Sequence, residues 1–160
     1  MQITVEGFNK KVTQELREAA EFFAYQLMDS RMVRNLTLDI EKYRDLEDPG
    51  EVVNEDGTYR SRWFTINIRA SKEDEDPVKT LAHEMVHVKQ YAKRELRKSI
   101  CVGKGLRQRR AVVWQGEPWL PKRNEDAYWD APWEIEAYGR EVGLYHKWVQ
   151  HYNTKKKSTV

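Results

Sequence analysis

Residues 76–92 read DPVKTLAHEMVHVKQYA, and the interpretation of the whole chain starts from this stretch. Apolar side chains recur there at spacings of three and four, which predicts a helix with one buried face. Asp76 and Pro77 mark its start, because aspartate accepts hydrogen bonds from the free N–H groups of a first turn and proline suits the first helical position. The stripe expected to be buried consists of Val78, Leu81, Ala82, Met85, Val88, Ala92 and Leu96.

His83 and His87 lie in the middle of this predicted helix, on the face opposite the apolar stripe. Residues four apart lie one above the other on a helix, so both imidazoles can point at a single ion. Zinc accepts neutral imidazole nitrogen, and Glu84 is placed to take a proton from water that zinc has acidified. The pattern H-E-x-x-H therefore predicts a zinc site with Glu84 as general base. The alternative is that both histidines are solvated surface residues.

A hydrolytic zinc site needs a third protein ligand and an open position for water. The best candidate is a carboxylate in the segment PWEIEAY, residues 132–138, which contains Glu134 and Glu136. It lies near a predicted helix start and close to Ala137, a small residue that permits another helix to approach. Outside this segment, the alternative third ligands are His146 and His151.

Upstream of residue 76 the sequence predicts one further helix and a small sheet. Apolar residues spaced by three and four predict a helix from Phe8 to about Ser30. Alternation of apolar and polar side chains predicts strands at 35–43 and 59–70, and a short strand is expected at 3–5. The turn signal Asp56-Gly57 predicts a hairpin that leads into the strand 59–70.

Downstream, residues 100–126 lack a clear period and predict an irregular region with a short strand at 111–114. The last helix is expected to have Asp130 as its N-cap and to run to about Tyr152. We expect a single domain over residues 1–153 and a basic flexible tail over 154–160. This order predicts an α+β fold, in which a small antiparallel or mixed sheet packs against three helices.

Composition narrows the class of protein. The 160 residues include six Trp, eight Tyr and four Phe, an aromatic content that argues against disorder. No apolar run approaches the roughly 20 residues of a membrane span, so no membrane partner is expected, and the N-terminus has no signal core. The single cysteine, Cys101, excludes an internal disulfide and favours a reducing cytoplasm. We expect Cys101 to be a small buried hydrophobe rather than a nucleophile or a ligand.

Basic residues concentrate between Lys89 and Arg123, where only Glu95 and Glu117 oppose them, although the net charge is only +2. The asymmetry indicates either a surface for nucleic acid or an acidic partner, or a solvated helix face followed by a solvated loop. No aromatic-basic repeat accompanies the stretch 89–123, which favours the solvated interpretation.

The H-E-x-x-H motif, followed by E-x-x-A on a second predicted helix, resembles the gluzincin pattern of zinc metallopeptidases. ImmA/IrrE-like peptidases and minimal zincin domains have this arrangement. The resemblance implies a zincin-like fold and one zinc ion per chain, held by His83, His87 and Glu134. It also implies cleavage of a peptide or protein substrate with Glu84 as the base. The chain is also similar to small metallopeptidase-like proteins of bacteriophages, which implies the cytoplasm of a bacterium or of a phage-infected host cell.

Two other classes stay open. SprT-like domains share H-E-x-x-H and a basic character, which would make the stretch 89–123 a DNA anchor, but they use histidine as third ligand. The fold can also serve as a non-catalytic binding module, and the motif does not exclude hydrolysis of a non-peptide bond. The chain departs from the gluzincin pattern at Tyr138, where those families often carry Asp or Asn to support a zinc-bound histidine.

The sequence leaves the supporting residues undecided. A donor for the oxyanion is expected near the metal. The strand before the motif helix, residues 59–70, is expected to pair with an extended substrate, as the resemblance to zincins implies. The candidate donors are Tyr128, Tyr138, Tyr145 and Arg140. The tryptophans that either line a cleft or pack in the core are Trp114, Trp119, Trp129 and Trp133.

Overall fold

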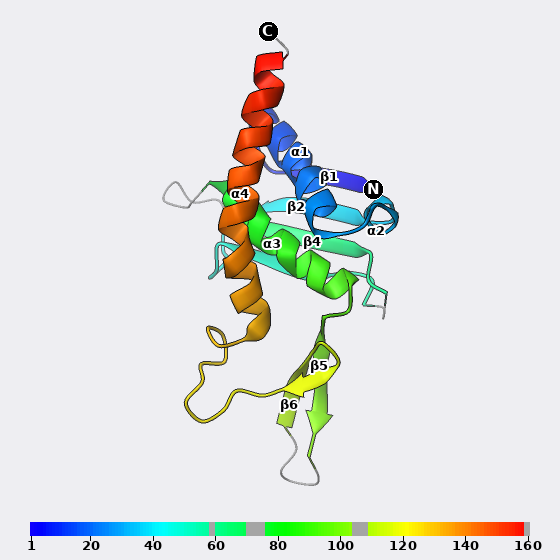
Figure 1. Ribbon diagram of the computed structural model, residues 1–160, viewed down its shortest axis with the longest axis vertical. Coiled ribbons are helices and arrows are strands. Elements are labelled where there is room, and N and C mark those ends of the chain that lie inside the picture. The colour runs from blue at the N-terminus through cyan, green and yellow to red at the C-terminus, as the bar shows by residue number, and fades with distance from the viewer. Residues whose placement is uncertain (58–59, 70–75, 104–108, 159–160) are drawn as a thin grey trace.

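The computed structural model describes residues 1–57, 60–69, 76–103 and 109–158. It has the α+β fold that the sequence predicts (Figure 1). In chain order the elements are β1 (Gln2–Glu6), α1 (Lys10–Leu27), α2 (Ser30–Arg34), β2 (Thr37–Tyr43), β3 (Gly50–Asn54), β4 (Trp63–Arg69), α3 (Pro77–Ala92), β5 (Leu96–Val102), β6 (Arg109–Trp114), β7 (Glu117–Trp119) and α4 (Pro132–Ser158).

The main sheet is mixed, with the strand order β1-β2-β4-β3. β1 and β4 pair with β2 in parallel, whereas β3 pairs with β4 as an antiparallel hairpin. Alternate residues such as Leu38, Ile40, Phe64 and Ile66 are fully buried, which confirms the predicted alternation. The hairpin turn is confirmed as well, and Gly57 adopts the positive φ of 55° that favours glycine there.

The order of the strands overturns the prediction that residues 59–70 pair with a substrate. β4 forms backbone hydrogen bonds with β2 on one side and with β3 on the other, so it has no free edge. Within the described residues, β3 is the edge strand on this side of the sheet. Strand order depends on contacts between segments distant in sequence, which local alternation does not report.

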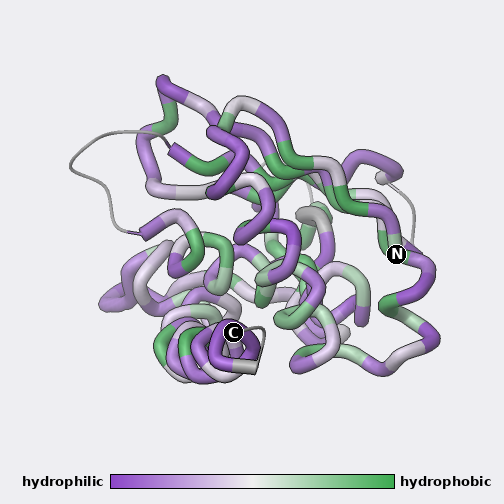
Figure 2. The backbone as a smooth tube through the Cα atoms, turned by 90° about the horizontal axis from the view of Figure 1, so that it is seen from above, coloured by the Kyte–Doolittle hydropathy of each residue, from purple (hydrophilic) through white to green (hydrophobic). Residues whose placement is uncertain are grey.

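α3 is the central helix, packed against β3 and β4 and against both α1 and α4 (Figure 1). Asp76 caps it as predicted, since its side chain accepts a hydrogen bond from the N–H of Val78 at 2.9 Å. On α4, the buried Trp148 packs on Phe22 and Phe23 of α1. Hydrophobic segments accordingly gather toward the middle of the molecule in Figure 2.

The segment after α3 differs from the predicted irregular region. The helix ends at Ala92, Arg94 has a φ of 63°, and Leu96 belongs to β5 rather than to the helical stripe. β5, β6 and β7 form a three-stranded antiparallel sheet, which includes the short strand predicted at 111–114. β5 and β6 project from the end of the molecule opposite the C-terminus (Figure 1). Cys101 on β5 is exposed, so the prediction of a buried cysteine is wrong.

α4 begins at Pro132, and Asp130 is not its N-cap. The carboxylate of Asp130 instead accepts a hydrogen bond from the N–H of Asp126, in the segment before the helix. The helix continues to Ser158, past its predicted end near Tyr152. None of the helices in the described parts of the chain combines the length and the hydrophobicity that a membrane span requires.

Candidate metal site

Three side chains from two helices converge on one point. His83 and His87 come from successive turns of α3, and Glu134 comes from the first turn of α4. The Nε2 atoms of the two histidines are 3.2 Å apart, and each lies 3.5 Å from Oε2 of Glu134. The structure therefore brings together the three residues that the sequence proposed as ligands.

All three residues are buried at the contact between α3 and α4. Their exposed fractions are 8% for His83, 9% for His87 and 7% for Glu134, so the interpretation of the histidines as solvated surface residues is wrong. Ala137 is completely buried beside them, consistent with a small residue that lets α4 approach α3 closely. The helix packing, rather than a loop, holds the carboxylate against the two rings.

The outer nitrogen of each ring is held by a hydrogen bond that fixes the tautomer. Nδ1 of His83 donates to Oε2 of Glu141 at 2.8 Å, and Nδ1 of His87 donates to Oε1 of Gln90 at 2.8 Å. Gln90 is fully buried and donates in turn to the backbone carbonyl of Trp133 at 2.9 Å. With Nδ1 as donor, a neutral ring presents a lone pair on Nε2, so both lone pairs face Glu134.

The arrangement fits a bound cation. Oε2 of Glu134 is buried and has no hydrogen-bond partner among the described residues. Tetrahedral zinc, with bonds of about 2.0–2.2 Å, holds its ligand atoms roughly 3.3–3.6 Å apart, close to the separations seen between His83, His87 and Glu134. Two imidazoles and one carboxylate are also a donor set that zinc uses in hydrolytic sites. The group could therefore hold a metal ion.

The pKa values of the three side chains also favour a bound cation. Burial opposes protonation of His83 and His87, but the Glu134 carboxylate beside them raises the pKa of both rings above the usual value. Burial likewise opposes ionisation of Glu134, yet the two rings lower its pKa to about 2. The point where the three side chains meet thus favours positive charge.

Glu84 lies beside this group, under the start of β3. It is 4% exposed, and burial raises its pKa to about 7. Gly50 makes room for it, because a Cβ at that position would lie 2.5 Å from Oε1 of Glu84 and 2.8 Å from Cγ2 of Thr80. A glycine at the first position of β3 therefore allows the carboxyl group to fit between the helix and the edge strand.

An open cleft runs past the group along the inner side of β3. A pocket of about 190 Å³ is lined by His83, Glu84, His87 and Glu134, by β3, and by Tyr128. An adjoining pocket of about 240 Å³ shares Tyr128 with it. The candidate metal group, which consists of His83, His87 and Glu134, is thus reachable from the surface, as is Glu84.

Only two of the four candidate oxyanion donors lie at the cleft. Tyr128 lines both pockets, and its hydroxyl is 3.3 Å from that of Tyr138, whose ring packs edge-on against His83 with centroids 4.5 Å apart. Tyr145 donates to Asp76 instead, and Arg140 pairs with Glu136. Tyr128 and Tyr138 are therefore the two candidates at the site.

The alternative third ligands lie elsewhere. Glu136 pairs with Lys89 at 2.6 Å and accepts from Gln90. His151 stacks on Phe22 of α1, with centroids 4.9 Å apart. His146 is exposed. None of these three residues belongs to the group formed by the two motif histidines and Glu134.

Some of the candidate cleft tryptophans and some residues of the basic stretch are packed inside the molecule, whereas others lie on the surface. Trp119 and Trp114 pack on Trp133, with ring centroids 4.9 and 6.3 Å apart, which attaches the small sheet to the start of α4. Trp129 is 63% exposed. In the stretch 89–123, Lys89 is buried between Glu95 and Glu136, whereas the exposed basic residues include Arg109, Arg110, Lys122 and Arg123.

Sequence reasoning missed the two residues that orient the histidines. Glu141 lies two helical turns after Glu134 on the same face of α4, and Gln90 lies one turn after His87 on α3. This spacing is the feature of the sequence that could have identified the two residues. It points to Glu141, however, only when α3 and α4 are already known to pack together. Glu141, three residues after Tyr138, is thus the side chain of α4 that binds Nδ1 of His83.

Removal of Glu141 is expected to weaken the metal site without abolishing it. Outer partners of ligand histidines contribute about 10–100-fold to metal affinity, so Glu141→Ala should lower zinc affinity by that factor. Glu141→Gln, which can still accept the Nδ1–H bond of His83, should recover part of the loss. Competition titration with a chromophoric chelator measures both, with Glu21→Ala on α1 as control. Equal affinities for the parent and folded Glu141→Ala would refute this role.

Within the described residues, His83, His87 and Glu134 are the one group of three or more histidine, cysteine or acidic side chains close enough to share an ion. The assignment depends on this geometry and on the two oriented rings. Comparison of the chain with protein-family models, with curated proteins and with solved structures finds no match.

Proposed function

We propose that this chain is a zinc-dependent metallopeptidase of the gluzincin type, with a zincin-like fold. The observation that carries the proposal is the buried convergence of His83, His87 and Glu134 on one point, with the carboxyl group of Glu84 at the edge of an open cleft. Two histidines and a glutamate would leave a fourth position of a tetrahedral zinc ion for water, as hydrolysis requires.

The roles divide between the ion and the side chains around it. His83, His87 and Glu134 would hold the zinc ion, which would supply a Lewis acid to polarise a carbonyl group and to lower the pKa of water toward neutrality. Glu84 accepts the proton of the attacking water and delivers it to the leaving nitrogen. Its place beneath Gly50 keeps the carboxyl group in the lining of the cleft, facing any substrate that lies along β3.

The edge strand β3 is the part of the sheet suited to hold a peptide. Within the described residues β3 pairs with β4 alone, and its residues Gly50, Glu51 and Val52 line the cleft beside the metal group. An extended peptide can add to such an edge through backbone hydrogen bonds. Tyr128, which faces the same cleft, is the side chain we assign to stabilise the oxyanion.

Peptide cleavage by the zinc-loaded protein is the direct test. A mixture of proteome-derived peptides, analysed by mass spectrometry, should acquire new termini in the presence of the loaded protein. A chelator should reduce this cleavage to background, and added zinc should restore it, because the base has no activated water without the ion. A protein that retains zinc but cleaves no bond in the mixture would instead be a binding module with a structural ion.

A further inference from the structure

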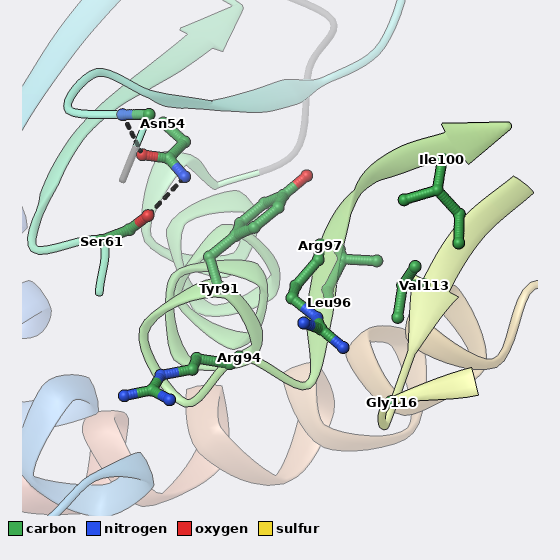
Figure 3. Close-up of a pocket in the computed structure, with 10 residues that line it drawn as sticks. Asn54, Ser61, Tyr91, Arg94, Leu96, Arg97, Ile100, Val113 and Gly116 are labelled. Carbon is green, nitrogen blue, oxygen red and sulfur yellow. Dashed lines mark hydrogen bonds between the residues drawn. The ribbon is translucent and has the colours of Figure 1, made fainter. Parts of the chain in front are cut away.

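A larger pocket of about 340 Å³ lies next to the cleft (Figure 3). This pocket lies between the β3–β4 hairpin on one side and β5 and β6 on the other. Tyr91 and Leu96 line both the pocket and the part of the cleft that contains the metal group. A substrate held beside the metal can therefore place a neighbouring side chain in this pocket.

One wall of the pocket is apolar. The ring of Tyr91 stands at the end of α3, facing Leu96, Ile100 and Val113 on the small sheet (Figure 3). Leu96 and Val113 are 5% and 4% exposed, whereas Ile100 is 44% exposed. Ile100 is thus an apolar side chain at the surface of the pocket that a bound group would cover. The tryptophan contacts with Trp133 hold the sheet that carries this wall.

The polar side chains that line the pocket differ from those around His83, His87 and Glu134. Arg94 and Arg97 line it, and none of its described lining residues carries a carboxylate. The polar side chains of the facing hairpin are paired with each other, since Asn54 Nδ2 donates to Oγ of Ser61 at 2.6 Å. The part of the cleft beside His83 and His87 is instead lined by several carboxylates. A cationic side chain would lose its hydration against the apolar wall, and none of the described lining residues offers it a carboxylate.

We propose that this pocket is a specificity site that selects a bulky apolar side chain of the substrate, such as Leu, Met or Phe, and rejects Lys and Arg. The inference rests on the proposed peptidase function and names its substrate class. A volume near 340 Å³ accepts such a side chain together with part of the backbone. Hydrophobic pockets discriminate side chains by about 10–200-fold for a methylene group, so preference for Leu over Ala should be at least tenfold.

The test uses zinc-loaded protein and a positional-scanning library of synthetic decapeptides, with cleavage sites read by mass spectrometry. At one position relative to the cleaved bond, the parent should prefer Leu, Met and Phe and disfavour Lys and Arg. Ile100→Glu adds a carboxylate to the pocket rim at an exposed site, so it should raise the Lys/Leu ratio at that position by about tenfold or more. Val142→Glu, a matched change at a 49% exposed position of α4, should keep the parental profile.

The experiment gives one result if the specificity site is wrongly assigned and another if the peptidase function is wrong. Cleavage with identical profiles for the parent and Ile100→Glu would refute the specificity pocket and leave the peptidase function intact. If no bond is cleaved, the peptidase function is wrong. The specificity pocket is then tested by measuring the binding of decapeptides. The zinc-loaded Glu84→Gln protein should then retain Leu-containing and Phe-containing decapeptides, and the Glu84→Gln, Ile100→Glu double variant should lose this preference. Equal retention by both would overturn the inference.

Discussion

Glu134→Ala is expected to remove stoichiometric zinc from the protein. The substitution leaves His83 and His87 as two ligands and deletes the one negative charge that faces both Nε2 atoms. Even outer partners of metal ligands contribute about 10–100-fold to affinity, so loss of a ligand should cost more than roughly 100-fold. Elemental analysis of protein loaded gently with zinc and then desalted should find about one ion per chain in the parent and a small fraction of that in Glu134→Ala.

Glu136→Ala is the matched control for this experiment. Glu136 lies two residues further along α4 and pairs with Lys89 rather than with the histidines. Its removal should leave most of the zinc in place, because Lys89 retains its ion pair with Glu95 at 2.6 Å. Loss of zinc from Glu136→Ala but not from Glu134→Ala would show that the wrong carboxylate has been assigned. A folded parent that retains no zinc would contradict the metal site itself.

The parts of the fold that were predictable are those encoded by local periodicity. Spacings of three and four located α1 and α3, and alternation located β2 and β4, because each element buries one face on the core. The helix start at Asp76 and Pro77 was also predictable, because an N-cap depends only on residues that are neighbours in the sequence. Glu134 could be proposed because it and Ala137, one turn later, form an E-x-x-A pattern that resembles the gluzincin motif.

The parts that were not predictable depend on contacts between distant segments. Nothing local distinguishes an edge strand from an inner one, so substrate pairing was predicted for β4, whereas β3 is the edge strand on that side of the described sheet. β5 escaped detection because Ile100 and Cys101 are both exposed, which removes the alternation that marks a half-buried strand. Glu141 and Gln90 meet the histidines only after α4 has docked on α3.

Glu84→Gln is expected to abolish most peptide cleavage while zinc remains bound. Glutamine has nearly the same shape as glutamate, so it should fit in the same space beneath Gly50 and leave the three ligands undisturbed. It cannot accept a proton from the attacking water, and positioned general bases contribute about 10²–10⁴-fold to rates. The rate should fall by that factor, measured on the best-cleaved peptide of the mixture. Glu21→Gln, at an exposed position of α1, should retain the parental rate.

Rate and zinc content measured on the same Glu84→Gln sample separate the two functions that this site can serve. In an enzyme the rate falls and the zinc stays, because Glu84 touches the reacting water and is not a ligand. In a binding module with structural zinc, Glu84 has no proton to transfer, so its replacement would leave binding of peptides unchanged. Parental cleavage by a zinc-containing Glu84→Gln protein would mean that another group near the cleft is the base. The carboxylate of Glu51 on β3, which lines the same pocket, would then be the next side chain to replace.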